Sequence, residues 1–116
     1  MKRDMDLMRQ LLLRAEASNE RRLKVNGAVE AYQVRLMVEE GLVNGVVIGN
    51  QKAGLPDDES YILSLTWAGH DFLDASRDEK LWRKAREKFL KPAASWTFSI
   101  LLEWLKAEIR NKIPSA

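Results

Sequence analysis

Residues 32–67 read YQVRLMVEEGLVNGVVIGNQKAGLPDDESYILSLTW, and the hydrophobic period changes twice within them. Apolar residues recur at helical spacing up to Gly41, β-branched residues dominate 42–48, and polar and apolar residues alternate over 60–65. Gly41 favours a left-handed helix end, and turn-forming residues separate the two β-rich runs. We therefore predict a helix, an antiparallel hairpin, and a further helix that the hydroxyl of Thr66 caps.

The same periodicities predict the elements on either side of this stretch. They are helices at 4–17, 28–40, 66–76 and 78–90, a short strand at 22–25, and a final helix that Ser95 caps and that ends near Lys112. The predicted fold is mainly α with a small antiparallel β-hairpin, which places it in the α+β class.

Length and composition favour one domain. A chain of 116 residues that is 46% hydrophobic can close about one core, so we predict a single domain over 1–116, with its core at 1–76 and a C-terminal helical extension at 77–116. The chain has no cysteine, so we expect no disulfide and no thiolate site, which fits a cytoplasmic setting. No apolar window approaches the ~18 residues that a membrane span requires, so we expect no membrane partner.

Several segments resemble known families. Residues 32–43 are similar to the third helix and exit of bacterial winged-helix repressors of the arsenical-resistance and multiple-antibiotic-resistance types, and LTWAG at 65–69 is similar to the segment that closes their wing. The whole chain, through 1–7 and 65–75 to Trp82, resembles a small bacterial and phage family described as a domain of unknown function. The resemblance implies a winged-helix fold with additional C-terminal helices and a phage or prophage association.

A winged-helix fold implies a regulator that binds double-stranded DNA. The implied contacts are Tyr32, Gln33 and Arg35 in the major groove, Lys52 at the wing tip, and Arg21, Arg22 and Lys24 along the phosphate backbone.

The DNA-binding regulator is the first expectation, and three features argue against it and leave a protein partner as the alternative. The helix at 28–40 has apolar residues on both sides, with Val29 and Leu36 opposite the core stripe, which is typical of a helix that also meets another protein. The segment 18–28 leaves little room for a positioning helix, and the acids at 57–59 would repel a phosphate near the wing. The alternative is a non-enzymatic interaction module on a winged-helix scaffold.

The aromatic residues favour packing roles. We predict that Trp67 and Trp82 pack in the core or against a subunit, because large aromatic residues more often supply buried area than a binding platform. On the last helix Trp96, Ile100 and Trp104 share one face, which we predict to be the contact of a homodimer.

Charged and titratable residues leave two further candidates. A basic set on 80–91 could bind an anionic partner, although such a helix face is more often simply solvated. His70 lies near Asp71 and Asp74, but a catalytic or metal site requires more groups than these. We therefore predict no catalytic residue, no metal ligand and no cofactor.

Overall fold

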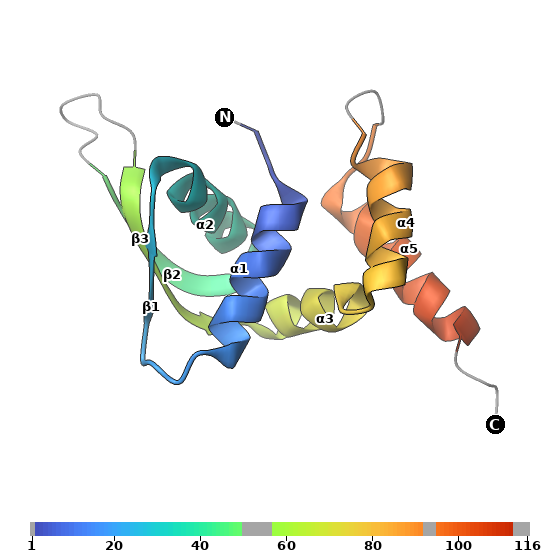
Figure 1. Ribbon diagram of the computed structural model, residues 1–116, viewed down its shortest axis with the longest axis horizontal. Helices are drawn as coiled ribbons and strands as arrows, with labels where there is room; N and C mark the ends of the chain where they lie inside the picture. Colours follow the sequence, from blue (N-terminus) through green and yellow to red (C-terminus); the bar gives the residue numbers. More distant parts are fainter. Residues whose placement is uncertain (1, 50–56, 92–94, 113–116) are drawn as a thin grey trace. The chain divides into compact units, whose positions relative to one another are not determined.

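The computed structural model describes residues 2–49, 57–91 and 95–112 and has an α+β fold (Figure 1). The elements in chain order are α1 (Met5–Ala17), β1 (Leu23–Asn26), α2 (Ala28–Glu40), β2 (Val43–Gly49), β3 (Asp57–Leu65), α3 (Trp67–Ser76), α4 (Glu79–Phe89) and α5 (Phe98–Lys112). The predicted fold class is confirmed. Contacts group the chain into two compact units, Met1–His70 and Asp71–Ala116, and the division falls within α3, on the N-terminal side of the predicted boundary at 76/77.

The first unit is built on a three-stranded antiparallel sheet with the strand order β1-β3-β2. Helices α1 and α2 lie on one face of this sheet (Figure 1). On that face, Val25 and Ile62 of the sheet and Val34 and Met37 of α2 are buried, so alternate strand residues and one helix stripe form the core. Gly45 allows β2 to lie close to β3, because a Cβ there would lie 2.7 Å from the backbone oxygen of Tyr61.

The end of α2 confirms the role predicted for Gly41. Its φ angle is 82°, in the left-handed region that a residue with a Cβ rarely adopts. The Gly41 amide donates to the Val38 carbonyl at 3.0 Å, and the Leu42 amide donates to the Met37 carbonyl at 2.8 Å. This pair of bonds is a Schellman motif, and it directs the chain from α2 into β2.

Thr66 connects the end of α2 to the start of α3. Its hydroxyl donates to the Gly41 carbonyl at 2.5 Å and accepts from the Gly69 amide at 3.0 Å, so the predicted cap is confirmed. The Thr66 amide also donates to the Leu42 carbonyl at 3.0 Å. Gly41, which ends α2, and Thr66, which caps α3, are therefore joined by hydrogen bonds in one junction.

The second unit packs aromatic side chains between its helices. Phe72 and Trp82 meet edge to face with ring centroids 6.0 Å apart, and Phe89 meets Trp104 in the same way at 5.6 Å. Trp82 is fully buried, as its predicted core role requires.

Helix α5 begins later than predicted, because Thr97 rather than Ser95 caps it. The Thr97 hydroxyl accepts from the Ile100 amide at 3.2 Å. Over the described part of the chain, no helix combines the length and the apolar character that crossing a membrane requires.

Candidate interaction surface

Gln33, the residue expected to read a base, is buried inside the first unit. Its side chain is 1% exposed, and both ends of its amide are bonded. The Oε1 atom accepts from the Asp4 amide at 2.8 Å, and the Nε2 atom donates to the Lys2 carbonyl at 2.9 Å. Gln33 therefore holds the segment before α1 against α2. The predicted contact of Gln33 in the major groove is wrong for this structure, because no base edge can reach its buried amide.

The rest of α2 also presents little that suits a DNA groove. Tyr32 and Arg35 are half-buried. Glu39 and Glu40 are exposed at the C-terminal end of the helix, where phosphate groups would meet negative charge. The exposed part of α2 is therefore partly acidic, unlike a surface that follows a phosphate backbone.

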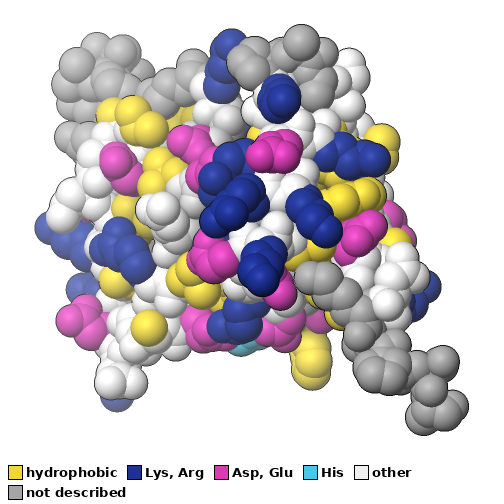
Figure 2. Space-filling view, turned by 45° about the vertical axis from the view of Figure 1, so that its right-hand side comes forward, with side chains coloured by type: hydrophobic (Ala, Val, Ile, Leu, Met, Phe, Trp, Pro, Cys, Tyr) yellow, Lys and Arg dark blue, Asp and Glu magenta, His cyan; other side chains and the backbone are white. Residues whose placement is uncertain are grey.

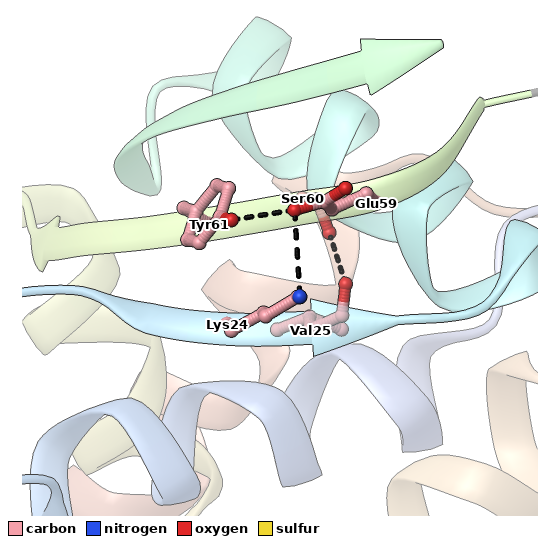
Figure 3. A network of polar contacts seen from close by, with 5 residues as sticks. All are labelled: Lys24, Val25, Glu59, Ser60 and Tyr61. Carbon is pink, nitrogen blue, oxygen red and sulfur yellow. Dashed lines mark hydrogen bonds and ion pairs between the residues drawn. The ribbon is translucent and has the colours of Figure 1, made fainter.

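The face of the sheet that α1 and α2 do not cover carries a network of charged and aromatic side chains (Figure 3). The Tyr61 hydroxyl donates to the Glu59 carboxylate at 2.5 Å, and the Lys24 ammonium lies 3.6 Å from the same carboxylate oxygen. The Arg22 guanidinium lies 5.0 Å from the centre of the Tyr61 ring, within cation–π range. Lys24, one of the predicted phosphate contacts, thus has a carboxylate beside it that offsets its charge.

This network shifts two pKa values in opposite directions. The hydrogen bond from Tyr61 and then the charge of Lys24 lower the pKa of Glu59 from its usual 4.5. The hydrogen bond to Glu59, followed by partial desolvation, raises the pKa of Tyr61 above its usual 10.0. The lowered pKa of Glu59 means that its contribution to stability is present above pH 4.5 and is lost as the pH falls through the folded-state pKa. The raised pKa of Tyr61 means that its contribution is present below pH 10.0 and is lost as the pH rises through the folded-state pKa.

The shift at Tyr61 gives a direct test of the network. The chain has two tyrosines, so a Tyr32→Phe variant leaves the phenolate absorbance to Tyr61. We expect its titration midpoint to lie above the usual tyrosine range, and Glu59→Gln in the same background to lower it, because the acceptor carboxylate is lost. An unchanged midpoint after Glu59→Gln would show that the hydrogen bond does not hold the phenol proton in solution.

Beside the network lies a strip of apolar side chains. Val46 is directly opposite Tyr61, and Ile48 is directly opposite Glu59, so both point to the same face as the network. Val46 and Ile48 are 48% and 49% exposed, and we call these two residues the apolar strip. Leu63 is also exposed, but it lies at a register shift between β3 and β2 and has no partner residue on β2. The outer sheet face comprises the apolar strip together with Lys24, Glu59 and Tyr61.

Trp67 is also exposed, which excludes the core alternative of its predicted packing role and leaves packing against a subunit a prediction. It is the first residue of α3, directly after the end of β3, and 88% of its surface is accessible. Trp67 is the first residue of the helix, one position after the Thr66 cap, whereas the buried residues of α3 lie further along it.

Comparison with known proteins places the chain in a family. The sequence profile described as "Hypothetical protein (DUF2513)" matches residues 2–95. The chain belongs to this family. A relative of this DUF2513 protein in Haemophilus influenzae (strain ATCC 51907 / DSM 11121 / KW20 / Rd), described as "Uncharacterized protein", is 27% identical over 94 residues that cover 74% of this chain and 76% of the relative. No solved structure matches significantly. The profile therefore covers the outer sheet face and α4 but leaves out α5.

The remaining predicted positions of this DUF2513 protein are scattered. Lys52 lies outside the described residues, and Arg21 is exposed in the turn before β1. On α2, Val29 is 52% exposed and Leu36 is half-buried, away from the outer sheet face. In the predicted dimer contact, Trp96 is half-buried, Trp104 packs on Phe89, and Ile100 is exposed. The homodimer therefore stays a prediction.

The titratable candidates do not converge on one site. His70 is exposed and lines a shallow cavity of about 220 Å³ with residues such as Glu16, Glu20 and Ser18. The Asp74 carboxylate instead accepts from Arg77 at 2.8 Å. Within the ranges that the structure describes, no three His, Cys, Asp or Glu residues are grouped as metal ligands would be.

Proposed function

We propose that this chain is a non-enzymatic interaction module, and that the outer sheet face binds an extended segment of a partner protein. One observation carries the proposal: Val46 and Ile48, each about half exposed, lie opposite Tyr61 and Glu59 on a sheet face that α1 and α2 leave uncovered (Figure 1). The winged-helix scaffold is part of the proposal, and the element order with the sheet order β1-β3-β2 supports it. The phage or prophage origin rests on the sequence resemblance alone.

The composition of the outer sheet face suits a protein partner. Interface centres are enriched in apolar and aromatic residues, and their rims are polar. The apolar strip supplies such a centre, and Tyr61 borders it. Lys24 and Glu59 form the rim, and their mutual contact leaves little net charge to attract a polyanion.

The edge position of β2 suggests how the partner would bind. In the strand order, β2 is a terminal strand that pairs only with β3 within the described sheet. Its sequence VNGVVIG contains no charged residue and no proline, two of the devices that discourage pairing with another chain, and the stretch 45–48 between its two register shifts pairs regularly. A partner strand could therefore add to β2 through main-chain hydrogen bonds, and alternate apolar side chains of that strand would contact Val46 and Ile48.

DNA binding through α2 has less support from the same geometry. The burial of Gln33 removes the predicted contact to adenine, and the exposed Glu39 and Glu40 oppose the approach of phosphate. The network on the outer sheet face has Arg22 and Lys24 against Glu59, an excess of one positive charge, whereas backbone binding depends on several phosphate contacts.

A pair of matched variants tests the proposal. The partner is first identified by crosslinking and mass spectrometry in the native cell, then purified for direct affinity measurement. We expect Ile48→Lys to weaken binding at least about tenfold, because a buried apolar contact becomes a desolvated charge. Val29→Lys makes a similar change at a site of similar exposure on α2, and we expect it to change the affinity less than about twofold.

The opposite result would exclude the outer sheet face. If Val29→Lys abolishes binding and Ile48→Lys does not, α2 is the contact surface. If the purified wild-type chain binds no protein of its own cell directly, the proposal that the chain is an interaction module is wrong. Circular dichroism of both variants separates lost binding from lost folding.

A further inference from the structure

The cationic face of α4 is distinct from the outer sheet face and has no role in the proposed protein contact. Figure 2 shows Lys and Arg side chains gathered on one face of the molecule, with fewer Asp and Glu among them. We propose that the exposed face of α4 binds the phosphate backbone of double-stranded DNA without reading its sequence. This inference stands independently of the proposed function.

The orientation of α4 is fixed by its buried side. The Asp78 carboxylate accepts from the Leu81 amide at 3.0 Å and begins the helix. Leu81, Trp82, Ala85 and Phe89 are buried. The remaining α4 residues are all exposed and all charged: Glu79, Lys80, Arg83, Lys84, Arg86, Glu87 and Lys88.

The charges on this face are sorted into rows. Residues four apart lie one above another along a helix, about 6 Å apart. One row is Lys80, Lys84 and Lys88, and the neighbouring row is Glu79, Arg83 and Glu87. The two acids therefore flank Arg83, and Glu87 also lies three residues from Lys84, but no carboxylate stands within the lysine row itself.

The lysine row is not explained by the stability of the helix. Like charges at a spacing of four residues destabilise a helix by about 0.2–0.5 kcal/mol per pair. Lys88 lies in the last turn, where a positive charge complements the helix dipole, but Lys80 lies in the first turn, where it does not. The five Lys and Arg of α4 against its two Glu give a charge of +3, whereas the whole chain carries only +2.

The neighbouring groups select the kind of anion. A helix that binds a membrane surface inserts apolar residues beside its basic ones, but the apolar residues of α4 are buried. Single-stranded nucleic acid is bound by stacking on exposed aromatic rings, and the exposed residues of α4 include none. A row of exposed lysines without Asn or Gln fits the regular phosphates of a duplex and supplies little base discrimination. The Lys88 ammonium also lies 6.0 Å from the centre of the Trp104 ring.

Fluorescence anisotropy with a labelled duplex of about 20 base pairs tests the inference. We expect the wild-type affinity to fall with salt with a logarithmic slope of about −3 to −4, as for roughly four phosphate contacts. Replacing Lys80, Lys84 and Lys88 together by Gln should weaken binding more than about tenfold at low salt and reduce the slope by about 3. Lys84→Gln alone should reduce the slope by about 1, and this single variant replaces the triple variant as the test if the triple variant folds poorly.

The matched control removes the same charge from other exposed positions. The triple variant Arg14→Gln, Arg21→Gln and Arg110→Gln should change the affinity less than about threefold. Equal losses in the two triple variants would show a response to net charge alone and would overturn the site. Absence of wild-type binding at low salt would also overturn it, as would binding to phosphatidylcholine vesicles with about 30 mol% phosphatidylserine in preference to the duplex.

Discussion

Gly69→Ala is expected to destabilise the first unit by about 3 kcal/mol or more, a large part of the stability of a small domain. A Cβ on Gly69 would lie 2.0 Å from the carbonyl oxygen of Leu42, a backbone atom that no side-chain rotation can move away. The same oxygen accepts from the Thr66 amide at 3.0 Å, so its displacement would also disturb the junction between α2 and α3. Because Gly→Ala inside a helix usually stabilises by about 1 kcal/mol, the predicted effect has the opposite sign to helix propensity.

Urea unfolding followed by circular dichroism measures this effect. Ala68→Gly is the neighbouring control, since Ala68 is exposed and the change should cost only the propensity difference of about 1 kcal/mol. A Gly69→Ala protein as stable as the wild type would mean that α3 does not approach the Gly41-Leu42 turn as closely as described.

Gln33→Leu is expected to lower the free energy of unfolding by about 2 kcal/mol, because two hydrogen bonds are lost and the Asp4 amide and Lys2 carbonyl lose their partner. Leucine has a similar volume, so the loss reports hydrogen bonding rather than a cavity. For a unit of this size the melting temperature should fall by roughly 10 °C.

Gln10→Leu makes the same chemical change at an exposed position on α1 and should stay within about 0.5 kcal/mol of the wild type. The comparison also separates two roles for Gln33. If Gln33→Leu kept full stability but abolished binding to duplex DNA, Gln33 would be a groove-reading residue after all, and its place in this structure would be wrong.

The elements that sequence predicted well are those with local signals. The span of α2 agrees with the prediction, and Gly41 and Thr66 act as expected, since their roles depend on a left-handed backbone and a nearby amide. At α5 two cap residues, Ser95 and Thr97, compete within three positions, and only the packing of the helix decides between them.

The binding surfaces were harder to predict because they depend on distant partners. The bonds of Gln33 come from residues about thirty positions away, which no local pattern reveals. On β3 the polar Ser60 is buried, where its hydroxyl donates to the Val25 carbonyl at 3.3 Å, and the apolar Leu63 is exposed. Alternation of polar and apolar residues identified the strand, but it misplaces Ser60 and Leu63. Ser64 is exposed, as alternation implies, because the register shifts at Leu63.

The two proposed surfaces should respond differently to salt. Contact through the apolar strip depends on burial of apolar area, which moderate salt changes little. Binding through the lysine row of α4 releases counterions and should weaken steeply as salt rises. A titration in salt therefore separates the two activities before any variant is made.

Chemical-shift mapping tests the central claim most directly. The isotopically labelled chain is titrated with its purified partner, and the backbone amide shifts are followed by residue. If the partner binds the outer sheet face, the largest chemical-shift changes should fall on β2 and β3, over 43–49 and 59–65, and the shifts of residues 28–40 should change little. Largest changes over 28–40, with β2 and β3 unaffected, would contradict the account.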